Sequence, residues 1–132
     1  MALWEGTPDF IAKLTTGVPP NVSRAAWATP REEELWREFT ADRKRAIAGR
    51  VGEWNLNPDA QAAFKRWFGN YRSAPQGWPE ELGYWVGMRI AEAYVARATD
   101  KAAALEALIT LAAPAAILAS SGYDGAPKSP KD

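Results

Sequence analysis

The sequence predicts an all-α fold, a compact bundle of about five to six helices around one central apolar helix at about residues 79–98. Three observations lead to this prediction. Apolar residues recur three and four apart over segments of helical length, no segment alternates between apolar and polar residues over the length of a strand, and capping residues recur ahead of prolines. The chain has 132 residues, of which 47% are hydrophobic, so it is most simply one domain with a buried core.

The central helix is expected in the stretch WPEELGYWVGMRIAEAYVAR, which runs from Trp78 to Arg97. Pro79 suits the first helical position, and the two glutamates after it favour the positive end of the helix dipole. Apolar residues cover more than one side, which is typical of a helix with neighbours packed around it. Gly87 in its middle costs roughly 1 kcal/mol relative to alanine, so we expect another backbone or a bulky ring to approach closely there.

Local start and stop residues divide the remainder of the chain. Thr7, Thr29 and Asn57 are cap residues followed by proline, and each opens an expected helix. Asp100 caps an alanine-rich helix, and Pro114 begins a last short one. The expected order is a helix at 8–16, a loop at 18–28, a helix at 30–48, a connection at 52–57, a helix at 58–68, the central helix, a helix at 101–111 and a helix at 115–121. Residues 1–123 then form a single helical domain, and residues 124–132 form a polar, flexible tail.

Composition excludes several classes of function. There is no cysteine, and therefore no disulfide, thiol nucleophile or lipidation site, and no histidine, the commonest general base and metal ligand. Lys plus Arg (16) equals Asp plus Glu (16), so no overall charge attracts nucleic acid or an anionic membrane, and we expect neither as a partner. No apolar run reaches transmembrane length and no signal peptide opens the chain, so the sequence as written is expected to be cytoplasmic.

Two carboxylates near the start of the chain are a candidate pair. Glu5 and Asp9 are four residues apart, which would place them on one helical face. They would act either as a metal ligand with a hydrogen-bonding partner, or as acids that complement the dipole in a first helical turn, which the spacing alone favours. Pro8 stands between them and leaves open whether one helix spans both.

Polar residues inside the central helix are a second candidate group. If Arg89 and Glu92 face inward they must be paired, Arg89 with Glu92 or with Glu5, whereas an exposed edge of the helix would explain both equally well. Tyr84 could donate a hydrogen bond to a substrate oxygen, although a core tyrosine bonded to a backbone carbonyl is the commoner reading. These residues alone do not make a complete catalytic set.

Two stretches resemble a known family. The first is LWEGTPDFIAKLTTG at 3–17, and the second is PEELGYWVGMRIAEAY at 79–94, followed by an aspartate-lysine helix start and the ending ILASSGY at 117–123. They are similar to the EG-x-A-D-F-I-A run, the GYxxGxRI-type helix and the IL-x-x-SGY ending of the predicted zinc-dependent proteases related to gliding-motility lipoproteins. The resemblance covers about residues 3–123, and the ordered set weighs more than any single motif.

The resemblance implies a gluzincin-like site. In that family two histidines of an HExxH helix bind zinc, the glutamate of that motif is the general base, and a downstream glutamate is the third ligand. Carried over by position, Glu5 is the candidate third zinc ligand and Asp9 a candidate group that hydrogen-bonds behind it. Tyr84 and Arg89 match the central helix, where the resemblance implies a role beside the substrate. The HExxH ligands and base are missing here, and Pro8 replaces the small residue expected between the two acids.

We therefore expect a truncated or decayed zinc-metallopeptidase-like C-terminal subdomain, or half of a split enzyme, that is catalytically incomplete on its own. No cofactor is expected in this chain alone, since zinc and a peptide substrate belong to intact relatives. The alternative is a non-catalytic helical interaction module. It would be a homodimer, or would bind a partner chain that covers an apolar face near Trp4 and Phe10.

Overall fold

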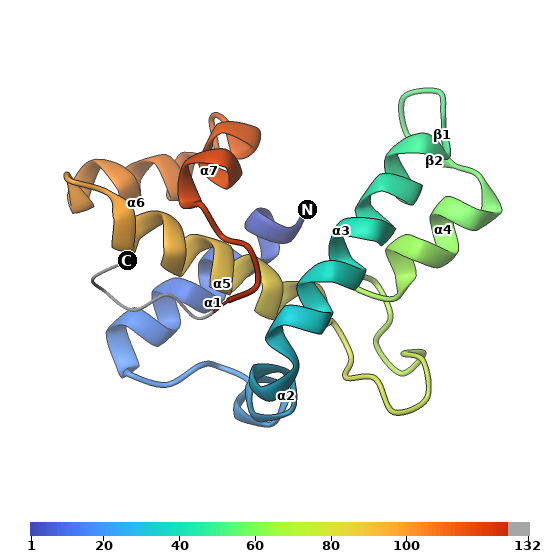
Figure 1. Ribbon diagram of the computed structural model, residues 1–132, viewed down its shortest axis with the longest axis horizontal. Helices are drawn as coiled ribbons and strands as arrows, with labels where there is room; N and C mark the ends of the chain where they lie inside the picture. Colours follow the sequence, from blue (N-terminus) through green and yellow to red (C-terminus); the bar gives the residue numbers. More distant parts are fainter. Residues whose placement is uncertain (127–132) are drawn as a thin grey trace.

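The computed structural model describes residues 1–126, which are mostly helical, and this confirms the all-α bundle (Figure 1). The elements are α1 (Ala2–Thr16), α2 (Val22–Ala28), the 3-10 turn η1 (Thr29–Arg31), α3 (Glu32–Ala48), β1 (Arg50–Val51), β2 (Asn55–Leu56), α4 (Pro58–Lys65), α5 (Leu82–Arg97), α6 (Lys101–Thr110) and α7 (Pro114–Ser121).

Helix α5 lies in the middle of the molecule, and α1 packs along it more extensively than any other pair of elements pack together. The expected close approach at Gly87 is confirmed. A Cβ at Gly87 would lie 1.8 Å from the carbonyl oxygen of Ala2 and 3.0 Å from the Cα of Gly6. A Cβ at Gly6 would in turn lie 2.3 Å from the carbonyl carbon of Gly87. The two helix backbones therefore touch at a pair of glycines, because any side chain there would hold them apart.

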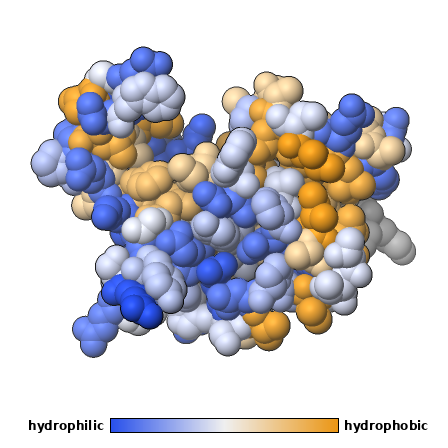
Figure 2. All heavy atoms as spheres, turned by 180° about the vertical axis from the view of Figure 1, so that it is seen from behind, coloured by the Kyte–Doolittle hydropathy of each residue, from blue (hydrophilic) through white to orange (hydrophobic). Residues whose placement is uncertain are grey.

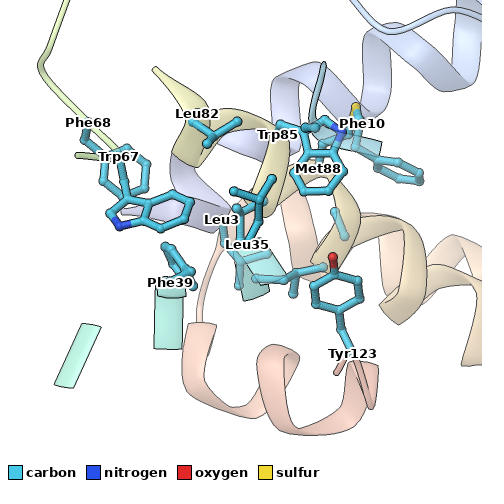
Figure 3. Close-up of a cluster of buried hydrophobic side chains, with 14 of the residues drawn as sticks. Leu3, Phe10, Leu35, Phe39, Trp67, Phe68, Leu82, Trp85, Met88 and Tyr123 are labelled. Carbon is cyan, nitrogen blue, oxygen red and sulfur yellow. The ribbon is translucent and has the colours of Figure 1, made fainter. Parts of the chain in front are cut away.

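The hydrophobic core runs across the bundle from Trp67 and Phe68, which follow α4, to Phe10 of α1 (Figure 3). Trp67 and Phe39 lie at one end, Leu3 and Leu35 lie in the middle, and Phe10 lies at the other end beside α5. Phe10 is only 5% exposed, so the expectation that it would contribute to an apolar surface is wrong. Its burial follows from the close contact of α1 with α5, which turns this face of α1 inward.

Helices α3 and α4 mainly pack against each other, and the antiparallel hairpin β1–β2 joins them. They form a lobe that projects away from α6 and α7 (Figure 1). Inside this lobe the carboxylate of Asp42, which is 3% exposed, accepts hydrogen bonds from the guanidinium of Arg66 at 2.5 Å and from the indole N–H of Trp67 at 2.9 Å. A buried carboxylate thus holds the start of the link after α4 against α3.

The central helix begins three residues later than the sequence predicts. Glu81 has φ 53°, in the left-handed region, and serves as the N-cap of α5. Its carboxylate and that of Glu80 accept backbone N–H groups of the preceding link, from Gly69, Asn70 and Arg72 at 2.7–3.1 Å. The two acids therefore stabilise the link at 69–72 instead of the first turn of a helix that begins at Pro79.

Two short elements stand where the sequence predicts irregular chain. Helix α2 lies within the expected loop at 18–28, and its N-cap is Asn21, whose side chain accepts the N–H of Arg24 at 2.9 Å. The expected connection at 52–57 contains β2, which pairs with β1 through Arg50 opposite Leu56. Both elements are only a few residues long, so they give no periodic signal in the sequence.

Ordered packing continues past the expected domain boundary at residue 123. Tyr123 is 7% exposed, and its hydroxyl donates a hydrogen bond to Glu32 at 2.8 Å. Gly125 lies against the side chain of Trp36, because a Cβ there would come within 2.4 Å of it. The remainder of the expected tail, residues 127–132, lies outside the described residues.

Candidate functional site

Glu5 and Asp9 share one face of α1, because the helix runs unbroken from Ala2 to Thr16 with Pro8 inside it. Pro8 removes the N–H that would bond to the carbonyl of Trp4, but the helix continues on both sides of it. The spacing argument from the sequence therefore holds, and Pro8 does not separate the two carboxylates.

Tyr84 of α5 meets Glu5 across the α1–α5 contact. The Tyr84 hydroxyl lies beside the Glu5 carboxylate, and hydrogen bonding to Glu5, together with burial and the negative charge of Glu5, raises the pKa of Tyr84 to about 12. The two stretches that carry the family resemblance are thus in direct contact through a pair of polar side chains.

Arg24 completes this group from α2. Its guanidinium lies 3.7 Å from a carboxylate oxygen of Asp9 and 5.5 Å from the centre of the Tyr84 ring. Burial raises the pKa of Asp9, and the charge of Glu5 adds to this, while the positive charge of Arg24 acts in the opposite direction. Burial also lowers the pKa of Arg24, so both partners have given up part of their hydration. We call Glu5, Asp9, Arg24 and Tyr84 the acidic face.

The sequence did not point to Arg24, because its helix was expected to be a loop. The signal that could have found it is Asn21, a favourable N-cap three residues earlier that follows two prolines. The Arg24 guanidinium also donates a hydrogen bond to the backbone carbonyl of Glu80 at 2.9 Å, which fixes α2 beside the start of α5.

Arg89 lies apart from the acidic face, in a second charged group. It forms an ion pair with Glu92, one of the two partners expected from the sequence, and not with Glu5. It also donates a hydrogen bond to the buried Glu32 at 2.7 Å. Burial disfavours the charged guanidinium, but the hydrogen bond and the charges of the two glutamates outweigh it and raise the pKa of Arg89. Glu92 also accepts from Lys13 at 2.5 Å. The Arg89 side chain therefore links α5 to α3 through Glu32. It is not part of the group that contains Tyr84.

The side chains of residues 1–126 do not by themselves fit a catalytic zinc. Such a site takes three protein ligands and keeps a fourth position open. With no histidine or cysteine, only carboxylates could serve, and no group of three comes together within residues 1–126. Of the two acids on the acidic face, Asp9 is already engaged with Arg24, which leaves Glu5 as a single carboxylate beside Tyr84.

A comparison with protein-family models, with curated proteins and with solved structures finds no match to this chain. None of the helices within residues 1–126 combines the length and the apolar character needed to cross a membrane.

Proposed function

We propose that this chain is a zinc-metallopeptidase-like C-terminal subdomain that contributes one carboxylate, Glu5, to a metal site whose remaining ligands lie on another segment or another chain. On its own it is catalytically incomplete. The observation that carries this proposal is the close contact of α1 with α5, which brings Tyr84 beside Glu5 and links the two stretches on which the family resemblance rests. A hydroxyl beside a carboxylate orients it by donating a hydrogen bond, as is common for metal-ligating carboxylates in other proteins.

The purified chain tests the first half of this proposal. Its zinc content is measured by elemental analysis, and its activity is measured on a mixture of unstructured peptides. We expect less than stoichiometric zinc and no hydrolysis, because a single carboxylate and no imidazole cannot make a three-ligand site. Tightly held zinc together with unaided hydrolysis would overturn the proposal.

The second half is tested by supplying the missing ligands. The DNA on the 5′ side of the Met1 codon is read for a segment that encodes HExxH, and that segment is expressed together with this chain. We expect the pair to retain zinc, and Glu5→Gln to weaken zinc binding by at least about tenfold, while Tyr84→Phe has a smaller effect in the same direction. Glu33→Gln, at an exposed acid of α3, is the matched control and should change nothing. Equal zinc affinity of the Glu5 and Glu33 variants would contradict a ligand role.

A second candidate function is a non-catalytic interaction module. It is favoured by large apolar side chains that remain exposed, among them Trp4 at 67% and Trp54 at 87%. Exposed apolar patches mark interaction surfaces more often than single exposed residues do. Trp4 lies in α1 next to Glu5 of the acidic face, whereas Trp54 lies in the turn between β1 and β2.

A further inference from the structure

A groove of about 700 Å³ lies between the lobe made by α3, the hairpin and α4 and the part of the bundle that contains the start of α1 and α7. Figure 2 shows the molecule from behind, where a hollow with apolar side chains along it separates the two parts. The side chains that line it are mostly apolar and come from both sides, including Leu3, Phe39, Phe64, Ile90 and Leu118.

Large apolar side chains extend from this groove onto its rim. Ile47 is 55% exposed, Val51 is 53% exposed, and Met1 at the opposite rim is 63% exposed. Trp54 projects furthest, with 87% of its surface exposed and no stacking contact with another aromatic ring of residues 1–126. An indole buries roughly 150–250 Å² when it is covered, so the rim carries a strong anchor that this chain leaves in water.

The charges beside the groove have both signs. Arg43 and Arg50 stand on the α3 and β1 side, and Glu53 stands in the turn of the hairpin next to Trp54. Arg43 and Glu53 are exposed and have no ion pair within residues 1–126. The surface therefore carries the exposed ring of Trp54 beside an apolar groove. It also carries one acid, Glu53, and one base, Arg43, that have no ion pair within residues 1–126.

Such a surface is complementary to itself. A two-fold interface uses the same patch on both subunits, so each feature must find its complement on that same patch. A partner of another kind would need only one member of each pair, a ring or a groove, an acid or a base. The net charge of zero adds no overall repulsion between copies.

We propose that a second copy of this chain docks on this groove in a two-fold symmetric dimer, in which the partner's Trp54 enters the groove and the partner's Glu53 pairs with Arg43. The hairpin of each subunit then packs against the groove of the other subunit. None of the four residues of the acidic face lines this groove, and the inference does not depend on the zinc-peptidase resemblance.

Sedimentation velocity over a range of concentrations, in the presence of a metal chelator, tests the dimer separately from any zinc site. We expect the unaltered chain to dimerise and Trp54→Ser to weaken the dimer by at least about tenfold, as truncation of a central aromatic anchor does. Trp4→Ser is the matched control, because it removes another exposed indole that does not line the groove, and it should leave the dimer unchanged.

Charge reversal tests the pairing between subunits. Arg43→Glu alone should weaken the dimer, because it places two acids together, and adding Glu53→Arg in the same chain should restore it. Circular dichroism confirms that each variant is folded. A chain that stays monomeric at every concentration, a Trp54→Ser variant that dimerises as tightly as the parent, or a monomer that carries an apolar small molecule in native mass spectrometry would each overturn the proposal.

Discussion

At the scale of single residues, the hydroxyl of Tyr84 reports whether Glu5 lies where the structure has it. The ordinary pKa of tyrosine is 10.0, and the interaction with Glu5, together with burial, raises that of Tyr84 to about 12. We predict that Glu5→Gln lowers the pKa of Tyr84 towards 10, measured from the ultraviolet absorbance of ionised tyrosine with Tyr84→Phe as the reference that identifies its signal. Identical titration curves for the Glu5→Gln variant and the parent would show that the two side chains do not meet.

The same shift has a consequence for stability. Since the pKa of Tyr84 is higher in the folded chain than in the unfolded chain, the protonated hydroxyl stabilises the fold fully below pH 10, and this contribution is lost as the pH rises through about 12. Tyr123 acts in the same direction, because its burial beside the negative charge of Glu32 raises its pKa as well.

Sequence reasoning at this scale identifies residues better than it identifies their partners. The four-residue spacing of Glu5 and Asp9 is a local property, and the structure confirms their shared face. The contact of Arg89 with Glu32 joins residues 57 positions apart, and no local pattern announces it. The meeting of Tyr84 with Glu5 likewise depends on how α5 crosses α1.

At the scale of helices, the crossing of α1 and α5 depends on Gly6 and Gly87. A methyl group at Gly87 would lie 1.8 Å from the Ala2 carbonyl oxygen, which is backbone and cannot rotate away. We predict that Gly87→Ala lowers the free energy of unfolding by about 1–3 kcal/mol, although alanine is the better helix former, because the overpacking outweighs the gain in helix propensity. Urea unfolding measures the change.

The control for this variant is Ala96→Ser, which adds one atom to an exposed position of the same helix and should change stability by less than about 0.5 kcal/mol. A Gly87→Ala variant more stable than the parent would mean that the two backbones are further apart than 1.8 Å implies.

The sequence predicts the start of a helix correctly where the capping residue bonds to a backbone N–H of that same helix. Asn57 and Asp100 each accept the backbone N–H three residues later, and α4 and α6 begin directly after them as predicted. The start of α5 was predicted wrongly because Glu80 and Glu81 accept N–H groups at 69–72, a tertiary use of side chains that also suit a first helical turn.

At the scale of the whole molecule, one network of charged side chains connects α3, α5 and α1 with Tyr123, which follows α7. Glu32, which is 5% exposed, accepts from both Arg89 and Tyr123. We predict that Arg89→Ala costs about 3–5 kcal/mol of stability, because it leaves a buried carboxylate without its counter-charge. The measurement is chemical denaturation of the two single variants, Arg89→Ala and Glu32→Ala, and of the double variant that carries both substitutions.

The double variant should lose less than the sum of the two single variants, since neither charge is then left alone. Arg37→Ala removes an exposed cation of α3 that has no ion pair within residues 1–126, and it should stay within about 0.5 kcal/mol of the parent. Additive losses at Arg89 and Glu32 would contradict a coupled network.

The contact of α1 with α5 joins parts of the chain that are synthesised far apart in time, since Glu92 follows its partner Lys13 by 79 positions. A ribosome needs several seconds to make that length of chain. Throughout this interval Leu3 and Phe10 have no covering helix, while α3 and α4 can already close on each other. The apolar face of α1 therefore stays without its main packing partner until α5 has been synthesised.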